Sequence, residues 1–552
     1  MYNPVEILSY AWFVVVFKSA LFWIYLWQLK EYHIGRFLDH FRTHKGKKVF
    51  LNFFFLFKVL LLGISFINFI IVFYLLLLLY LAEIILIFVK RRKRPKWTLK
   101  TIFLTAASFF AIAIFWALTG ALLSGRSFLV SIILFDILSP IIFSVVVLIF
   151  QPFFVVGRNR ILDKAKDKIS KFLSAPAGLT ASSAQAGAKA GGQAGKNLTV
   201  IGITGSYGKT STKEFLTTIL SSQFKVLSTK EHKNSEIGIA QTILSDLNEK
   251  HEVFIVEMGA YKKGGIELLC DMTKPRIGIV TGVNEQHLAT FGSMENILSA
   301  EGGFELLESL PQDGLLVVNG DNKWCMELYK KANIHKMIYS LKNDKVKSDA
   351  WAEEITIGEH SLDFLLLTEG KTTTHITANI LGRHNIQNLL GAILVAKELG
   401  MTLEEVSKAC KEITQKQGAT TLKKGIHGIN IIDSSYSSNP DGVMADLDYL
   451  NVFGGKKVIV MPCLIELGRK SSEVHKQIGE KIAKVCDMAI ITTKDRFEDI
   501  KMSAVHHGMA ENKILFIEKP KEIFNTITTF SKSGDTVLLE GRVPSELIKL
   551  LQ

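Results

Sequence analysis

The sequence predicts an N-terminal all-α transmembrane region of about five helices, followed by two α/β domains. Long apolar runs fill the first third of the 552 residues, and short β-branched runs alternate with helical segments in the rest. A stretch rich in Ala, Gly and Ser separates these two patterns. We therefore expect a transmembrane region over 1–173, a flexible linker over 174–196, a central domain over 197–417 and a C-terminal domain over 418–552.

The basic charge of the chain lies in its first third. Residues 1–173 hold 22 Lys and Arg against 7 Asp and Glu, whereas the remainder holds 43 against 45. A nucleic-acid-binding protein should carry its basic patch on a folded domain, so no nucleic-acid partner is expected. Basic loops between apolar helices are instead typical of membrane proteins, and lipid is an expected partner. The five cysteines show neither CxxC nor zinc-ligand spacing, and we expect scattered buried thiols.

Four apolar runs in the first third are candidates for membrane spans. A helix needs about 20 residues to cross the ~30 Å hydrocarbon core of a bilayer. The runs at roughly 6–29, 101–123 and 128–151 have that length. The run at 50–89 is long enough for two spans, so it is either one very long helix or a hairpin.

Flanking charges divide the long run and orient the region. Three lysines precede this run, and KRRKRPK follows it at 90–96. Because basic loops stay in the cytoplasm, both ends should lie on the same side, with a turn near Gly63 or Asn68. The basic segment at 158–168 is also assigned to the cytoplasm. We therefore expect a multi-pass protein of the cytoplasmic (inner) membrane with five spans, its N-terminus outside and its α/β domains facing the cytoplasm.

Four charged residues fall inside or near the expected spans: Lys18, Lys58, Glu83 and Asp136. Charges within a membrane span are functional candidates by default, and Asp136 is the most central of the four. Structural roles stay open, because Lys58 could reach the interface with its long side chain and Glu83 lies near a helix end.

Alternating strands and helices are expected after residue 197. The apolar runs at 198–204, 253–259, 276–283 and 314–321 predict buried strands of a mostly parallel sheet covered by helices. A second set follows residue 418, with the runs INIIDSS, KKVIVMPC, MAIITTK, KILFIEK and DTVLLEGR. Its pattern is Rossmann-like, but it lacks GxGxxG, so no dinucleotide is implied.

A phosphate-binding loop joins the first of these strands to a helix. Residues 203–215 read ITGSYGKTSTKEF. The common GxxxxGK[ST] form fails because Ile203 stands where its first glycine is expected, and the shorter TGSYGKT remains. Backbone N–H groups and a helix N-terminus would face the anion, Lys209 would reach the β- and γ-phosphates of ATP, and Thr210 can bind Mg²⁺. The expected nucleotide-binding residues are Thr204, Gly205, Ser206, Tyr207, Gly208, Lys209, Thr210 and Ser211.

This short loop resembles the ATP loop of the Mur ligases, and most closely that of the MurF type, which adds D-Ala-D-Ala to the peptidoglycan precursor. The resemblance continues in order along the chain to residue 542. Its motifs are NSEIG (234–238), VEMGAYKKGGI (256–266), GVNEQHLATFGSMENI (282–297), LGRHNIQNLLGA (381–392), IIDSSYSSNPDGV (431–443), IELGRKSSEVH (465–475) and LLEGR (538–542). A set of this length in matching order is far more specific than a phosphate loop alone.

The resemblance implies a ligase that forms an amide from a carboxylate and an amine. The carboxylate would attack the γ-phosphate of ATP, and the amine would then displace phosphate from the acyl phosphate. By the same resemblance Lys209, His287 and Glu301 are the catalytic candidates, Thr210 and Glu257 hold one Mg²⁺, and His287 serves a second. His384 and Asn388 would line the adenine pocket, and Asp433 would lie on the nucleotide side.

The sequence departs from the family at four places. Glu301 stands where members usually carry a lysine modified to a carbamate, Ala419 where an arginine is expected, and Ser434 where a nucleotide-contacting Asp is expected. Nothing matches the domain that grips the UDP-sugar. A permanent carboxylate at Glu301 could replace the carbamate, and the acceptor could be presented at the membrane.

Three functions remain open from the sequence. The favoured one is a membrane-anchored ligase that joins an amino acid or dipeptide to a UDP- or lipid-linked cell-envelope carboxylate. The changes around ATP also suit a protein that binds nucleotide without catalysis. A different ATP-using class, such as a folylpolyglutamate-type ligase or a transport ATPase, fits the C-terminal motifs and the few central membrane charges less well.

Overall fold

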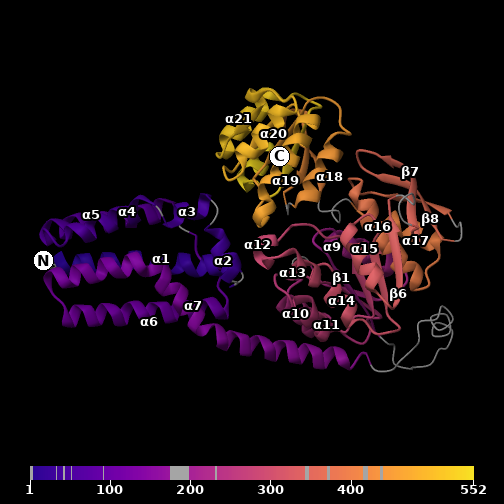
Figure 1. The fold of residues 1–552 in the computed structure, drawn as a ribbon. Helices are drawn as coiled ribbons and strands as arrows, with labels where there is room; N and C mark the ends of the chain where they lie inside the picture. Colours follow the sequence, from indigo (N-terminus) through magenta and orange to yellow (C-terminus); the bar gives the residue numbers. More distant parts are fainter. Residues whose placement is uncertain are drawn as a thin grey trace. The chain divides into compact units, whose positions relative to one another are not determined.

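The computed structural model describes residues 4–552 except 31, 33, 42–43, 51, 91–92, 174–197, 231–232, 342–346, 370–372, 415–419 and 436–438. The chain divides into two compact units, Met1–Arg160 and Ile161–Gln552. The first unit is helical, and the second carries two β-sheets with helices packed on them (Figure 1). The expected linker at 174–196 and the expected domain boundary at 417–418 both lie outside the described residues.

Among the described residues of the first unit, four helices are long and apolar enough to cross a membrane. They are α1 (Pro4–Leu29), α6 (Leu99–Leu122), α7 (Gly125–Ser170) and the Phe69–Ile87 part of α5 (Phe69–Lys90); the shorter helices are α2 (Ile34–His40), α3 (His44–Phe50) and α4 (Phe53–Ile64). The fifth expected span corresponds to α4, which is apolar but has only 12 residues. These helices indicate a multi-pass membrane region with four helices of spanning length.

The long apolar run at 50–89 is indeed two helices. Chain reversal occurs between α4 and α5, where the Asn68 side chain accepts a hydrogen bond from Ile71 N at 3.2 Å. Asn52 caps the start of α4 in the same way, through Phe55 N at 3.0 Å. Asparagine satisfies backbone N–H groups that the first helical turn leaves unpaired, which explains why the break falls at Asn68.

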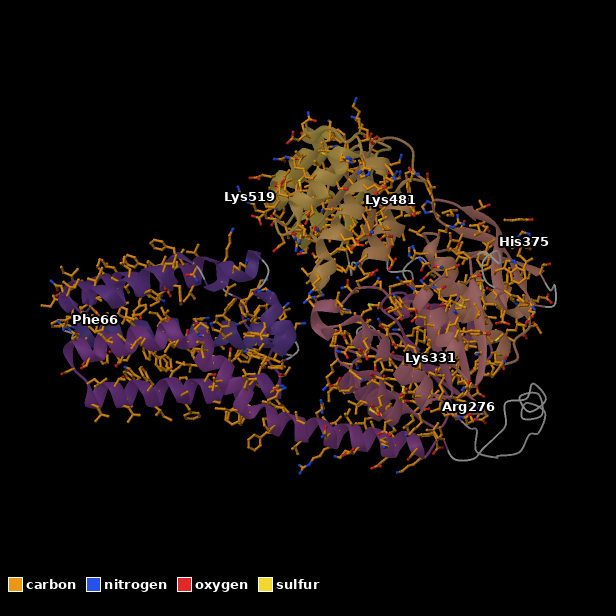
Figure 2. The ribbon with its side chains drawn as sticks, viewed as in Figure 1. Phe66, Arg276, Lys331, His375, Lys481 and Lys519 are labelled. Atoms are coloured by element: carbon orange, nitrogen blue, oxygen red, sulfur yellow. The ribbon has the colours of Figure 1, made fainter. Side chains whose placement is uncertain are left out.

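The outer surface of the helical unit is apolar. Phe66 is 62% exposed and Ile67 is 84% exposed in the turn between α4 and α5, and Leu99 is 89% exposed at the start of α6. Figure 2 shows mainly carbon along these helices, whereas nitrogen and oxygen atoms tip many side chains of the α/β domains. An exposed apolar surface of this extent suits contact with lipid.

A buried ion cluster joins three helices of this unit. The Lys58 ammonium on α4 lies 2.6 Å from Glu83 Oε1 on α5 and 2.7 Å from Asp136 Oδ2 on α7. All three side chains are at most 8% exposed. Lys58 therefore does not extend to an aqueous edge but pairs with two of the other charges that the sequence singled out.

Helix α7 is a single helix of 46 residues, although the sequence predicts a span that stops near residue 151. Pro140 and Pro152 lie inside it, and the apolar run passes without a helix stop into RNRILDKAKDKIS. Its last turns belong to the second unit, where Leu162, Ala165 and Ile169 are buried in the core beside β1. Leu198 N donates to Phe172 O at 3.2 Å, so the described residues that flank 174–197 lie next to each other.

The central domain is built on a nine-stranded sheet. Its order is β2-β3-β1-β4-β5-β6-β7-β8-β9, parallel from β2 to β7 and antiparallel from β7 to β9. The four strands expected from the sequence are confirmed as β1, β3, β4 and β5, which lie together in the sheet. The strands are β1 (Thr199–Thr204), β2 (Val226–Ser228), β3 (Val253–Glu257), β4 (Ile277–Val280), β5 (Leu315–Asn319), β6 (His335–Ser340), β7 (Ala350–Ile357), β8 (Leu362–Thr368) and β9 (Thr373–Ala378).

Helices cover both faces of this sheet, and their apolar sides form two core clusters. Helix α9 follows the phosphate loop and packs with α16. The helices are α9 (Lys209–Ser221), α10 (Glu236–Asp246), α11 (Gly265–Thr273), α12 (Leu288–Phe291), α13 (Met294–Ser299), α14 (Phe304–Ser309), α15 (Lys323–Lys331), α16 (His384–Glu398) and α17 (Leu403–Cys410).

The C-terminal domain has a six-stranded sheet of order β10-β11-β15-β12-β13-β14. All five strands that the sequence predicts are present and parallel, and β10 adds an antiparallel edge. The strands are β10 (Thr421–Lys424), β11 (Asn430–Ser434), β12 (Lys457–Met461), β13 (Met488–Ile491), β14 (Ile514–Phe516) and β15 (Thr536–Glu540); the helices are α18 (Pro440–Leu450), α19 (Ser471–Val485), α20 (Phe497–His506), α21 (Pro520–Phe530) and α22 (Ser545–Leu551). The five cysteines of the chain are buried free thiols, as expected.

Candidate active site

The glycine-rich loop begins at the end of β1 and closes over the start of α9. Gly205 has a φ of 140° and Gly208 a φ of 76°, backbone conformations that side-chain-bearing residues rarely adopt. A Cβ on Gly208 would lie 2.4 Å from Asn388 Oδ1, so a larger residue would also collide with α16. Ser206 N donates to Gly282 O at 2.7 Å, which fixes the loop against the chain after β4. The loop is therefore held as a tight turn at a helix N-terminus, the arrangement that binds phosphate.

Lys209 and Glu301 meet at this loop. The Lys209 ammonium donates to Gly205 O and lies 3.9 Å from Glu301 Oε1. Ser206 Oγ donates to Glu301 Oε2 at 3.0 Å, and Glu301 is only 2% exposed. The structure thus places the carboxylate of Glu301 among the phosphate-loop side chains, beside the lysine that would contact the nucleotide.

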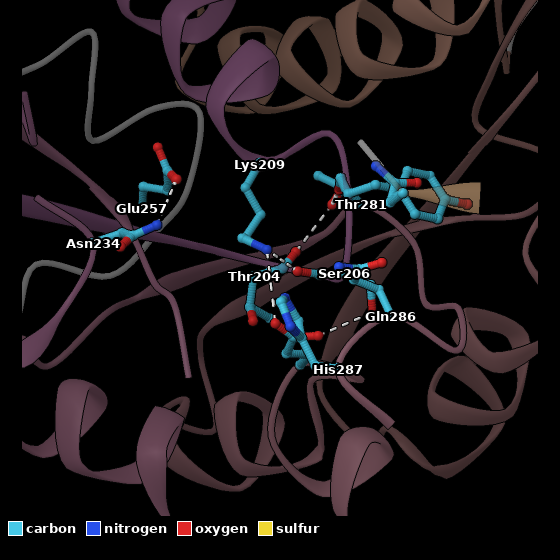
Figure 3. A network of polar contacts seen from close by, with 12 residues as sticks. Thr204, Ser206, Lys209, Asn234, Glu257, Thr281, Gln286 and His287 are labelled. Atoms are coloured by element: carbon cyan, nitrogen blue, oxygen red, sulfur yellow. Dashed lines mark hydrogen bonds and ion pairs between the residues drawn. The ribbon is translucent and has the colours of Figure 1, made fainter. Parts of the chain in front are cut away.

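Glu257 lies at the carboxyl end of β3, where its carboxylate accepts two hydrogen bonds and pairs with a lysine. Thr210 Oγ1 donates to Glu257 Oε1 at 3.1 Å, and Asn234 Nδ2 donates to the same oxygen at 3.0 Å (Figure 3). The fully buried Lys213 ammonium lies 3.2 Å from Glu257 Oε2. The structure therefore brings Thr210 and Glu257 together as the sequence predicts. Sequence reasoning missed Lys213, although its spacing from Lys209 places both lysines on one face of α9.

His287 lies on the segment that follows β4 and makes a different set of contacts. Its Nδ1 is 2.7 Å from Glu466 Oε2 in the C-terminal domain, and the Tyr261 ring packs edge-on at 5.8 Å. His287 has a φ of 67°, in the left-handed region. Sequence reasoning did not single out Glu466, because a partner 179 residues away leaves no local pattern.

The remaining loop residues lie within the protein. Thr204 and Ser211 are buried. The Tyr207 hydroxyl accepts a hydrogen bond from Asn322 Nδ2 at 3.3 Å, and burial raises its pKa. Asn388 Oδ1 accepts from Thr212 Oγ1 at 3.4 Å, so Asn388 lies against the base of the phosphate loop. Its assignment to the adenine pocket stays a prediction.

His384 and Asp433 lie in different domains. His384 opens α16 in the central domain, and burial lowers the pKa of its imidazole. Asp433 lies near the end of β11, where it accepts from Ser435 Oγ at 2.6 Å and pairs with Lys423 at 3.2 Å. Both assignments to the nucleotide stay predictions.

Ser434 takes part in a polar cluster of the C-terminal domain. Its hydroxyl donates to Asp446 Oδ2 at 2.5 Å, and Glu540 stands opposite Ser434 in the neighbouring strand. Burial, followed by the charge of Asp446, raises the pKa of Glu540 well above its usual range. Ser434 thus stands where the family has an aspartate, beside the two buried carboxyl groups of Asp446 and Glu540. Ala419, the other departure in this domain, lies outside the described residues.

The side chains around the loop fit a magnesium ion that is shared with a nucleotide. Thr210 and Glu257 offer hard oxygen donors on adjacent elements, which Mg²⁺ prefers. Within the described ranges, no three His, Cys, Asp or Glu side chains gather as a self-sufficient metal site. Mg²⁺ usually takes one or two carboxylates and completes its octahedron with phosphates and water, so the donor set suits Mg²⁺ bound with ATP.

Two family models match the second unit of the chain. The Mur ligase middle domain matches residues 203–396, and the Mur ligase, glutamate ligase domain matches residues 420–543. The UDP-N-acetylmuramoyl-tripeptide–D-alanyl-D-alanine ligase of Buchnera aphidicola is 30% identical over 336 residues, 60% of this chain and 72% of that protein. The chain belongs to the Mur ligase family. It is accordingly an ATP-dependent ligase of the type that forms carbon–nitrogen bonds.

Two further relatives are UDP-N-acetylmuramoyl-tripeptide–D-alanyl-D-alanine ligases as well. The Bacillus subtilis enzyme is 27% identical over 355 residues, 63% of this chain and 75% of its own length. The Escherichia coli enzyme is 29% identical over 281 residues, and the match spans 51% of this chain and 61% of the relative. The family matches begin at residue 203, and long apolar helices stand in place of an N-terminal Mur ligase domain.

Solved structures agree with this assignment. The crystal structure of MurF from Acinetobacter baumannii aligns with a TM-score of 0.57 at 26% identity, covering 64% of this chain and 76% of that one. MurF from Thermotoga maritima in complex with ADP aligns with a TM-score of 0.58 at 22% identity, covering 71% and 83%, which supports the fold alone. The phosphate loop, Glu257 and Glu466 all lie in the part that belongs to the family.

Proposed function

We propose that this Mur ligase joins an amino acid or a dipeptide, such as D-Ala-D-Ala, to a carboxylate of a cell-envelope precursor. The observation that carries the proposal is the phosphate loop, where Lys209 and Thr210 stand beside Glu257 and Glu301. The relatives named above, which are UDP-N-acetylmuramoyl-tripeptide–D-alanyl-D-alanine ligases, support the choice of amine. The relatives do not identify the acceptor, because long apolar helices stand in place of an N-terminal Mur ligase domain.

The reaction would proceed through an acyl phosphate. A carboxylate oxygen of the acceptor attacks the γ-phosphorus of ATP, and the bond to the β-phosphate oxygen breaks to release ADP. The amine nitrogen then attacks the acyl carbon, phosphate leaves, and the amide nitrogen loses a proton. Because negative charge accumulates on the phosphates, catalysis depends largely on positioning and charge neutralisation.

Each loop residue has a role in this scheme. Lys209 would turn from Gly205 O to the β- and γ-phosphates, and the backbone N–H groups of the loop would hold the remaining oxygens. Thr210 and Glu257 would hold a magnesium ion, which neutralises phosphate charge when bound, and His287 would serve a second. We assign Glu301 the role of a permanent carboxylate beside Lys209, in place of the modified lysine of the family.

We further propose that the helical unit places the ligase at its acceptor. Four helices of spanning length would hold the chain in the cytoplasmic membrane, with the two α/β domains on the cytoplasmic side, where ATP is available. A lipid-linked carboxylate would then lie within reach of a ligase tied to the same membrane. A soluble UDP-linked acceptor is the alternative substrate.

A second candidate function is nucleotide binding without catalysis. The observation that favours it is the carboxylate of Glu301 beside Lys209. This carboxylate adds negative charge next to the lysine that would contact a polyphosphate, and such repulsion would weaken turnover.

ADP release by the full-length protein in detergent tests both candidates. UDP-muramoyl-tripeptide and a lipid-linked acceptor would each be offered with D-Ala-D-Ala, beside Lys209→Ala and the control Lys230→Ala, an exposed lysine that pairs with Asp246. We expect acceptor-dependent ADP in the wild type and the control, and a loss of about 10²- to 10³-fold in Lys209→Ala. Saturable ATP binding with no turnover on either acceptor would favour the second candidate.

A further inference from the structure

The two α/β domains meet at a contact between His287 and Glu466. His287 Nδ1 lies 2.7 Å from Glu466 Oε2, and the two side chains are 20% and 8% exposed. A second bond supports the first, because Ala289 N donates to the backbone carbonyl of Glu466 at 3.0 Å. Glu466 therefore holds both the side chain of His287 and the backbone two residues beyond it.

Both residues of this contact have a left-handed backbone. His287 and Glu466 each have a φ of 67°, and neither is a glycine. Such conformations cost free energy and persist only where the surroundings enforce them, which is common at functional sites. Gly468, with a φ of 54°, brings the same loop close enough that its Cβ would lie 3.5 Å from Ala289 N. The loop after β12 is thus shaped to fit the segment that carries His287.

One short segment, Thr281–Ala289, connects this contact to the phosphate loop; we name it the bridging segment. On one side Thr281 Oγ1 donates to Tyr207 O, and Gly282 O accepts from Ser206 N at 2.7 Å. On the other side Asn284 Nδ2 donates to Asp441 Oδ2 of α18 at 2.6 Å. The bridging segment therefore touches the nucleotide loop and two elements of the C-terminal domain.

We propose that Glu466 is a positioning residue that prepares His287 to bind a magnesium ion. An imidazole that donates Nδ1–H to a carboxylate keeps the lone pair of Nε2 free for a metal, and such carboxylate partners are common behind ligating histidines. This inference rests on the proposed function, in which His287 serves a magnesium ion. Because Glu466 belongs to the C-terminal domain, the metal site is complete only when that domain is docked on the bridging segment.

The consequence is a link between domain docking and metal-dependent nucleotide binding. The central domain alone supplies the phosphate loop, Thr210 and Glu257. The C-terminal domain supplies Glu466, so loss of this carboxylate should weaken the contribution of Mg²⁺ without removing the phosphate loop. A residue that merely packs the two domains together would instead change nucleotide binding equally with and without metal.

The test measures the Kd of a non-hydrolysable ATP analogue for the full-length protein in detergent, with MgCl₂ and with EDTA. The variants are Glu466→Ala, Glu466→Gln and His287→Ala, and the matched control is Glu473→Gln, an exposed glutamate of the same region that pairs with Lys470. The quantity compared is the ratio of the Kd in EDTA to the Kd in MgCl₂. We expect Glu466→Ala and His287→Ala to reduce this ratio by about 10- to 100-fold, with the Kd in EDTA unchanged. Glu466→Gln should lose less, because an amide oxygen still accepts from Nδ1–H, and Glu473→Gln should match the wild type.

Two results would overturn the inference. The first is that both Glu466 variants keep the wild-type effect of Mg²⁺ on the Kd while His287→Ala loses it. The second is that the Glu466 variants bind the analogue more weakly by the same factor in MgCl₂ and in EDTA. If Glu466→Ala fails to fold, the Glu466→Gln ratio decides by the same criteria. A wild type whose binding does not depend on Mg²⁺ would instead refute the metal assignment of the proposed function, so the two failures are distinguishable.

Discussion

Two buried lysines of this chain lie in similar ion clusters but in different regions. In the helical unit Lys58 lies 2.6 and 2.7 Å from the carboxylates of Glu83 and Asp136. In the central domain Lys213 lies 3.1 and 3.2 Å from those of Glu214 and Glu257. Each lysine is thus paired with two acids, and burial alone does not tell the two clusters apart.

The surroundings of the acids differ between the two clusters. Glu83 and Asp136 come from apolar helices, so their pairing with Lys58 joins α4, α5 and α7. Glu257 instead receives further hydrogen bonds from Thr210 and Asn234 at the mouth of a phosphate loop. A carboxylate that gathers hydroxyl and amide donors beside an anion site is suited to a metal, whereas one that bridges apolar helices is suited to holding them together. We therefore assign stability to the first cluster and chemistry to the second.

The largest effect is expected from Lys58→Met. The substitution leaves two buried carboxylates without the lysine between them, and breaking a buried ion pair typically costs about 3–5 kcal/mol. Thermal denaturation in detergent should show this loss, while ADP release per folded molecule stays near wild type. The triple variant with Glu83→Gln and Asp136→Asn removes the charges as well and should recover much of the stability. Lost turnover in a folded Lys58→Met protein would contradict the assignment.

Lys213→Met should lower ligase turnover strongly and stability only a little, the reverse of Lys58→Met. Glu257 keeps Thr210 and Asn234 as donors, and the Glu214 side chain is 28% exposed, so it can turn to water. We expect a stability loss of about 1–2 kcal/mol but a fall in ligase turnover of about 10²-fold, because the charge around Glu257 is no longer balanced. Glu214→Gln is the control, since it spares Glu257. Equal turnover in Lys213→Met and Glu214→Gln would remove Lys213 from the site.

The comparison also shows what the sequence could predict. The phosphate loop, Lys209, Thr210 and the strand ending in Glu257 follow from local patterns, because a strand, a glycine turn and a helix specify one another over a few residues. The meeting of Thr210 with Glu257 is implied by the family resemblance, and the sheet explains it, since parallel strands bring their carboxyl ends to one edge. The structure confirms that meeting at 3.1 Å.

Other features depend on contacts that no local pattern records. Glu466 reaches His287 across 179 residues, and Lys58 chooses partners on two other helices. The apolar run predicts a span that stops near residue 151, whereas α7 continues through the basic segment that follows to Ser170. In each case the tertiary arrangement, which the sequence encodes only as a whole, decides the outcome.

A third pair of buried carboxylates, Asp446 and Glu540, has no lysine among its described contacts. Asp446 accepts from Ser434 and Thr420, and the raised pKa keeps Glu540 protonated in the fold at pH values where the unfolded chain ionises it. The contribution of Glu540 to the free energy of unfolding is therefore full below about pH 4.5, and it falls as the pH rises towards the pKa of Glu540 in the folded state. His384 faces the same Asp446, and its own pKa is lowered by burial.

Glu540→Gln should remove this pH dependence. The amide imitates the protonated acid, so the variant should gain about 1.4 kcal/mol of stability over the wild type for each pH unit from the Glu540 pKa of the unfolded chain up to its pKa in the fold. Melting temperatures from pH 5 to pH 8 would fall for the wild type and stay flatter for the variant. Parallel curves for the two proteins would show that Glu540 is already ionised in the fold.

The smallest effect is expected from replacing residues 174–196 with about six Gly and Ser residues. Helix α7 already connects the two units before residue 174, because its final turns are buried in the second unit through Leu162 and Ile169. Phe172 and Leu198 are already hydrogen-bonded at 3.2 Å, so a short loop can connect them. The replacement halves the length of this segment about twice, so it should stabilise the second unit by only about 1 kcal/mol. Turnover on either acceptor should stay unchanged. Lost turnover on a lipid-linked acceptor alone would show instead that the expected flexible linker gives the ligase its reach to the membrane.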